Sequence, residues 1–259
     1  MEVHHHPHVE KKSFKEYLLE GLMIFLAVSM GFIAESIREH ITEEKQVKEY
    51  MKEIVENLRY DTLRMNKNTV RNIVIMKSLD SFRYEILQAR SGMINSNRLY
   101  YLQAKSFGYN SVVFNTSAIS QLKSSGALRL IENRKLAEKM DDYYLRRISS
   151  AEIQKPSSEA SVERQGVLNK IFSKEYFENA LANRDGWNAN VFVDYRYLLT
   201  MNPSPRLLTS TPEDFQQLYN TTWVYENGLI GYNNFIFYAR ELADELIVEI
   251  QKEYHLENE

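Results

Sequence analysis

The sequence predicts an all-α protein with one N-terminal transmembrane helix followed by a helical bundle whose first and last helices are long. Three observations lead to this fold class. A single apolar run lies near the N-terminus, the segment after it carries apolar residues at helical spacing, and a helix start signal precedes another long segment near the C-terminus. We expect residues 1–16 to form a cytoplasmic His-rich tail, residues 17–37 the transmembrane helix and residues 38–259 an extracytoplasmic bundle domain.

The candidate membrane helix is the run YLLEGLMIFLAVSMGFIAESI, residues 17–37. Glu20 and Glu35 bracket only about fourteen uncharged residues, roughly 21 Å of helix, which is short for a span. The whole run covers about 30 Å, enough to cross if the carboxylates reach interfacial water or are shielded by a partner. A helix that lies on a surface or is buried, and a signal peptide processed near residues 27–29, stay open as alternatives.

The lysines that flank this run indicate its orientation. Lys11, Lys12 and Lys15 crowd the amino-terminal side, whereas Arg38 and more distant lysines follow the run. The positive-inside rule therefore slightly favours a cytoplasmic N-terminus. In a bacterium this arrangement places the chain in the inner membrane and its large domain in the periplasm.

Within the apolar run, small and polar residues recur at intervals of three and four. They place one small and polar face on the helix, which is typical of a face that packs against another membrane helix. We expect it to contact other membrane subunits or a second copy of the chain; the alternative is a lipid-facing anchor with glutamates at the interfaces. The face consists of Glu20, Met23, Ala27, Gly31 and Glu35.

The histidines are confined to the ends of the chain. No histidine lies between His40 and His255, which excludes histidine-based triads and imidazole metal sites from the core of the bundle. The N-terminal tail is a candidate metal site because clustered imidazoles suit zinc, copper or nickel, and a flexible tail is the alternative. Its histidines are His4, His5, His6 and His8.

Composition excludes further classes of function. The chain has no cysteine, which excludes thiol nucleophiles, disulfides and thiolate metal sites, and its glycines form neither a P-loop nor a dinucleotide fingerprint. We therefore expect no enzyme and no cofactor. The formal net charge is −3 with interspersed signs, so no basic stripe predicts nucleic acid as a partner.

Residues 41–90 predict one long helix or two nearly collinear ones, because they contain neither proline nor glycine and their apolar residues follow helical spacing. Continuity of this helix with the membrane helix stays open. Asn57, Asp61 and Asn68 interrupt the apolar seam, which favours packing inside a bundle over a long regular coiled coil. The seam consists of Val47, Met51, Ile54, Leu58, Met65, Ile73, Met76 and Leu79.

Capping residues delimit the helices in the middle of the chain. Asn115 or Thr116 is expected to begin a helix that Gly126 ends in a left-handed conformation. Asn133 is expected to begin the next helix. That helix should turn inward Leu136, Met140 and either Tyr143 or Tyr144.

Further along, the pattern is less regular. We expect a break at Lys155-Pro156-Ser157-Ser158, a helix over residues 159–181, a turn at residues 183–186 and irregular or helical structure at residues 191–195. Asp141-Asp142 beside the tyrosine pair is compatible with calcium or sugar binding, or with a capped helix end next to core tyrosines.

The last helix has a strong start signal, with Thr211 as its cap, Pro212 at its first position and two acidic residues in its first turn. Its apolar residues, which include Leu218, Trp223 and Phe237, continue to about Tyr254. This length suits antiparallel packing along the first long helix.

The segment Leu122-Lys123-Ser124-Ser125-Gly126, with the residues that follow it up to the tyrosine pair, resembles the signature of a Bacteroidota family of single-pass membrane proteins of unknown function. That family also begins with a basic tail, a hydrophobic helix with a glutamate near its start, and a long charged helix. The resemblance extends from the anchor to about Tyr144. It departs at Glu35-Ser36-Ile37-Arg38, where the family tends to have an Asn-Trp pair. The resemblance implies location and fold, and it carries over no functional residues.

We expect a non-catalytic accessory or scaffolding subunit of a bacterial envelope complex. A periplasmic ligand-sensing or binding domain is the first alternative, and it requires a defined pocket in the bundle. A carboxylate-dependent hydrolase is the second, and it requires at least two buried acids that converge in a cleft.

Overall fold

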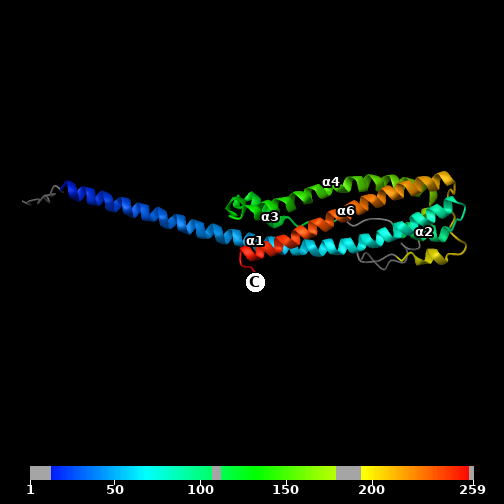
Figure 1. Ribbon diagram of the computed structural model, residues 1–259, viewed down its shortest axis with the longest axis horizontal. Coiled ribbons are helices and arrows are strands. Elements are labelled where there is room, and N and C mark those ends of the chain that lie inside the picture. The colour runs from blue at the N-terminus through cyan, green and yellow to red at the C-terminus, as the bar shows by residue number, and fades with distance from the viewer. Residues whose placement is uncertain (1–12, 107–111, 179–193, 257–259) are drawn as a thin grey trace, which may run out of the picture.

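One helix forms both the projecting N-terminal segment and the first helix of the bundle in the computed structural model (Figure 1). This helix, α1, extends over Phe14–Arg90, so the two long elements predicted on either side of residue 37 are one continuous helix of 77 residues, about 115 Å long. The structure describes residues 13–106, 112–178 and 194–256, apart from the side chains of residues 146–158.

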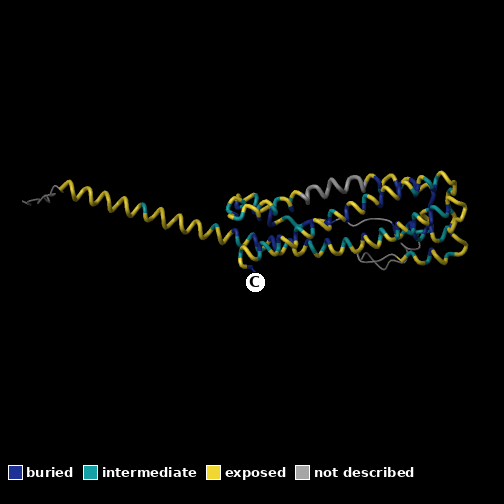
Figure 2. Tube along the Cα trace, in the orientation of Figure 1, coloured by how far each residue is buried: buried dark blue, intermediate teal, exposed yellow. Residues whose placement is uncertain are grey.

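The projecting part of α1 makes no contact that buries it. From Ser13 to Gln46 no residue is buried, and Val47 is the first residue of α1 in the core (Figure 2). From there α1 packs along α6, Pro212–Glu253, in the antiparallel arrangement that the sequence predicts. The expected cap at Thr211 is confirmed, because its hydroxyl accepts a hydrogen bond from the Asp214 backbone N–H at 3.2 Å.

The third long helix, α4, extends over Arg134–Ile171 and packs against α6. The predicted cap is confirmed, since the Asn133 side chain accepts a hydrogen bond from the Leu136 N–H at 3.2 Å. Leu136, Met140 and Tyr143 are buried as expected. The predicted break at Lys155-Pro156-Ser157-Ser158 is wrong: the α4 backbone stays helical through it. One proline removes a single backbone hydrogen bond, and packing of α4 on α6 outweighs that loss.

The other helical elements among the described residues are short. They are α2 (Ser96–Lys105), α3 (Ser117–Ser124) and the 3-10 helices η1 (Ala127–Leu130), η2 (Lys174–Phe177) and η3 (Arg196–Thr200). Gly126 ends α3 with φ 75°, as predicted. The helix expected over residues 159–181 ends earlier, at Ile171, where Phe172 pairs with Leu207 in an isolated bridge. The turn expected at residues 183–186 lies outside the described residues, as do residues 191–193.

The core extends along the whole bundle in three clusters. The cluster nearest the projecting helix joins α1, α3, α4 and the end of α6, and contains Met51, Met65, Leu122, Met140 and Ile250. The cluster at the far end contains Phe82, Tyr100, Phe172, Leu198 and Phe215, with Leu79, Tyr225 and Leu229 between the two. Tyr100 and Tyr232 are fully buried, and Tyr101, Tyr195 and Tyr197 pack on the far cluster, so these tyrosines are core or rim residues.

Candidate functional site

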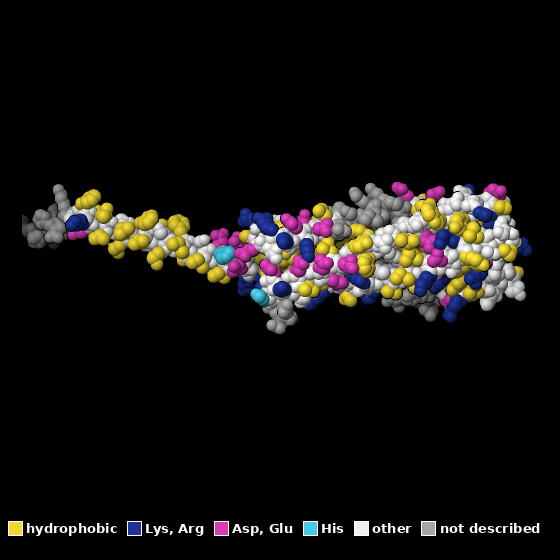
Figure 3. All heavy atoms as spheres, in the orientation of Figure 1, with side chains coloured by type: hydrophobic (Ala, Val, Ile, Leu, Met, Phe, Trp, Pro, Cys, Tyr) yellow, Lys and Arg dark blue, Asp and Glu magenta, His cyan; other side chains and the backbone are white. Residues whose placement is uncertain are grey.

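The projecting part of α1 is the first candidate functional surface. It is long and apolar enough to cross a membrane by length and composition, with a mean hydropathy of 1.9 in its most apolar window and none of that window buried. Figure 3 shows hydrophobic side chains along the visible side of this segment, in contrast to the charged base of the bundle beside it. A surface of this kind is stable only when lipid or another apolar surface covers it.

The predicted packing face lies within this segment, with Glu20, Met23, Ala27, Gly31 and Glu35 all exposed. A Cβ built on Gly31 would meet nothing within 4 Å, so no contact among the described residues requires its small size. Glu35 accepts a hydrogen bond from Arg38 Nε at 3.0 Å, which partly neutralises one end of the face.

The predicted metal-binding histidines His4, His5, His6 and His8 lie outside the described residues, so tail binding stays a prediction. Within residues 13–106, 112–178 and 194–256, no group of three or more histidine or acidic side chains is arranged to hold a metal ion.

A cavity of about 410 Å³ lies at the base of the bundle, and we call it the foot pocket. It is lined by His40 from α1 and His255 from the residues after α6, with four glutamates and one lysine among the other lining residues. His40 Nε2 is 3.2 Å from Glu44 Oε1. Antiparallel packing of the first and last helices brings the two histidines to the wall of one pocket. The antiparallel packing was predicted from the sequence, but the presence of both histidines in one pocket was not. The pocket is lined by His40, Glu43, Glu44, Val47, Lys48, Leu130, Glu132, Glu253, Tyr254 and His255.

Asp61, predicted only as an interruption of the apolar seam, holds three elements together. Its side chain is fully buried and accepts hydrogen bonds from the Asn115 N–H at 2.9 Å and from the Tyr143 hydroxyl at 3.1 Å. Burial, with the Asp61 charge beside it, raises the pKa of Tyr143, so the phenol remains a proton donor. This carboxylate therefore joins α1 to α4 and to the start of α3.

Two other carboxylates among the described residues, Glu85 and Glu226, are buried, and the partly exposed Asp141 also has a partner. Glu85 forms an ion pair with Arg98 at 2.7 Å, and Glu226 one with Arg83 at 2.6 Å. Asp141 lies inside α4 rather than at a helix end, and it pairs with Lys123, which also lies 4.1 Å from the Tyr144 ring centroid. Each of these acids therefore serves a contact between helices.

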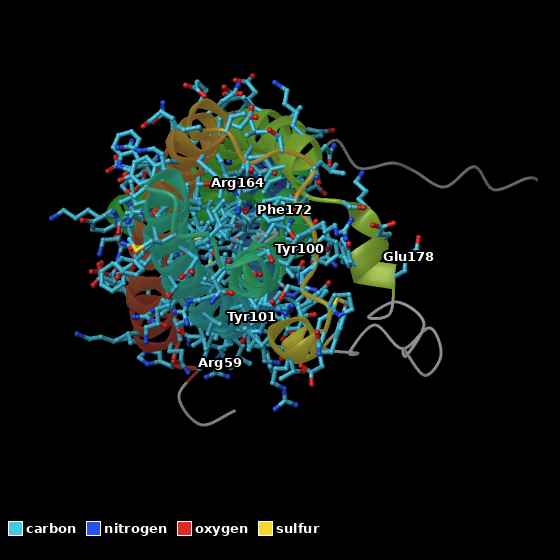
Figure 4. The ribbon with its side chains drawn as sticks, turned by 90° about the vertical axis from the view of Figure 1, so that its right-hand side faces the viewer. Arg59, Tyr100, Tyr101, Arg164, Phe172 and Glu178 are labelled. Carbon is cyan, nitrogen blue, oxygen red and sulfur yellow. The ribbon has the colours of Figure 1, made fainter. Side chains whose placement is uncertain are left out.

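Arg164 of α4 is a buried cation in the far half of the bundle (Figure 4). Its guanidinium donates hydrogen bonds to Ser106 Oγ at 2.8 Å and Thr222 Oγ1 at 3.3 Å, and it lies 5.0 Å from the Tyr225 ring centroid. No carboxylate among the described residues forms an ion pair with it, and burial lowers the pKa of Arg164 to about 10. Hydroxyls and aromatic faces thus replace a counter-ion, which no local sequence signal indicated.

No family model matches the chain, and no curated protein and no solved structure matches it either. Membership of the Bacteroidota family that residues 122–144 resemble therefore stays a prediction.

Proposed function

We propose that the chain is a membrane-anchored, non-catalytic accessory or scaffolding subunit of a bacterial envelope complex, with its span in the inner membrane and its bundle in the periplasm. The observation that carries the proposal is the continuity of α1. An apolar segment with no buried residue continues into the bundle core as one helix, so the bundle is attached to the proposed membrane segment by a rigid connection rather than a flexible linker.

The exposed face with Ala27 and Gly31 supports contact with a partner helix. Small residues let two helix backbones approach closely in lipid, where van der Waals packing drives association. Gly31→Leu fills that space but leaves the helix no less hydrophobic, so the variant should reach normal membrane levels and lose the proteins that co-purify with the native chain. Phe32→Leu is the control, since Phe32 is 73% exposed on another side of the helix. Full retention of partners by Gly31→Leu would show that the segment is only a tether.

The orientation is tested with protease. If the bundle is periplasmic, protease added to spheroplasts should digest it while a cytoplasmic marker survives. Digestion only after lysis would reverse the proposed topology.

One observation favours ligand sensing as a second candidate function. The foot pocket begins at His40, three residues beyond the predicted end of the span, so an occupant would act directly on the base of α1. Native mass spectrometry of the purified chain should then detect a bound small molecule that Leu130→Trp, which fills the pocket, removes. If the native chain carries no bound small molecule, the ligand-sensing function is contradicted and only the scaffold proposal remains.

A further inference from the structure

The outer side of α6 differs from that of an ordinary surface helix. α6 is the central long helix of the bundle, since it packs against both α1 and α4 (Figure 1). Its inner side supplies buried Tyr225, Leu229, Tyr232 and Ile236. The opposite side of a helix in this position is normally polar, because water covers it.

On that outer side, two residue types repeat every seven positions. Trp223, Ile230 and Phe237 form one series, with 51%, 43% and 45% of their surfaces exposed. The second series is exposed too, and each of its members precedes a member of the first by three residues. Together they form a heptad seam with asparagine at a and a large apolar residue at d. We call it the α6 seam, and it consists of Asn220, Trp223, Asn227, Ile230, Asn234 and Phe237.

The surroundings of the seam suit a neighbouring helix. A groove of about 450 Å³ between α6 and α1 is lined in part by Ile73, Met76, Trp223 and Ile230. Gly231 adjoins the seam, and a Cβ built on it would meet nothing within 4 Å. Glycine inside a helix costs about 1 kcal/mol relative to alanine, and packing among the described residues gives no reason for it. Close approach of a second helix would give one.

The pattern also indicates which helix fits. Asparagine at a positions favours two parallel strands in register, because the amide of each asparagine faces its own copy across the axis. Two copies anchored in one membrane are necessarily parallel. Their α1 helices are continuous, so each holds Ile73, and the seam beside it, at the same height of about 54 Å above the predicted end of the span.

We propose that the α6 seam is a homodimer contact, in which α6 of a second copy packs parallel and in register about a two-fold axis along the membrane normal. The proposal rests on the membrane anchoring proposed above.

The sequence also limits this contact. The next two seam positions toward the membrane are Glu241 and Asp244, which would face their own copies as like charges, so the contact ends at Phe237. Asparagines at successive a positions weaken a coiled coil while fixing its register. The pairing is therefore weak in dilute detergent and depends on the high effective concentration that the membrane provides.

Cysteine cross-linking of the full chain in native membranes tests the proposal, because the chain has no cysteine of its own. Ile230→Cys should form a disulfide-linked dimer at twice the 30.5 kDa monomer mass after brief oxidation, since facing residues across the axis satisfy the distance limits of a disulfide. Asn234→Cys should do the same. Val162→Cys is the matched control: Val162 is 74% exposed on α4, away from the seam, and should give at least five-fold less dimer.

A second variant separates association from random collision. Ile230→Lys places like charges in the middle of the seam, so in the Asn234→Cys background it should reduce the dimer at least five-fold. Equal dimer from Val162→Cys and Ile230→Cys, or no effect of the lysine, would overturn the proposal. An adduct of another mass would also overturn it, by showing that a different protein occupies the seam. If no other protein co-purifies with the chain, the scaffold proposal fails while the Ile230→Cys dimer still forms, so the two failures are distinguishable.

Discussion

Replacing Tyr143 by phenylalanine tests the buried link between α1 and α4. The substitution removes one hydroxyl and keeps the ring, whose contact with Phe114 at a centroid distance of 6.0 Å is retained. Asp61 is fully buried and loses one of its hydrogen-bond donors, at 3.1 Å, while the Asn115 N–H remains.

The expected loss follows from the charge and burial of the acceptor. A hydrogen bond to a charged group contributes roughly 1.5–3 kcal/mol, and a buried acceptor that loses its donor gains no water in exchange. We therefore expect Tyr143→Phe to lower the free energy of unfolding by about 2 kcal/mol. For a chain of this size that corresponds to a fall in Tm of about 4–8 °C. The raised pKa keeps the phenol protonated, so the loss should be the same at pH 6 and pH 9.

The measurement is thermal unfolding of the full chain in detergent, followed by circular dichroism. Tyr84→Phe is the matched control, because Tyr84 is 60% exposed and its loss should stay within about 0.5 kcal/mol. If Tyr143→Phe is as stable as Tyr84→Phe, the Tyr143–Asp61 hydrogen bond contributes nothing to the fold and the reasoning is refuted.

Three other predictions concern local structure. Gly126→Val should destabilise the chain by about 1 kcal/mol or more, because φ is 75° there. Gly166→Ala inside α4 is the control and should be neutral or stabilising. Equal melting temperatures for the two variants would contradict the assigned cap. Thr211→Ala should lower the free energy of unfolding by about 1 kcal/mol and speed amide hydrogen exchange in the first turn of α6, because the cap hydrogen bond is lost. Unchanged exchange would argue against that cap. Hydrogen bonds from Arg196 lower the pKa of Asp194 from 3.8 to about 2, so their contribution to stability is present above pH 4 and lost as pH falls through 2. Arg196→Gln should return that pKa to its ordinary range in an NMR titration, and a pKa that stays near 2 would disprove the pairing.

The sequence by itself determined the features that depend on neighbouring residues. Periodicity and the absence of proline and glycine predicted the bundle part of α1, and hydropathy predicted its exposed apolar segment. The caps at Asn133 and Thr211 and the left-handed Gly126 were predicted because each acts within one turn of its own helix.

Only the tertiary structure decided features that join distant segments. It kept α4 helical through Pro156, because packing on α6 outweighs one lost backbone hydrogen bond. It gave Asp61 partners more than fifty residues away and left Trp223 exposed on a helix whose inner side is filled by other residues. Hydrophobic spacing marks which residues share one side of a helix, but which side is covered depends on how the helices assemble, and that assembly is set by contacts across the whole chain.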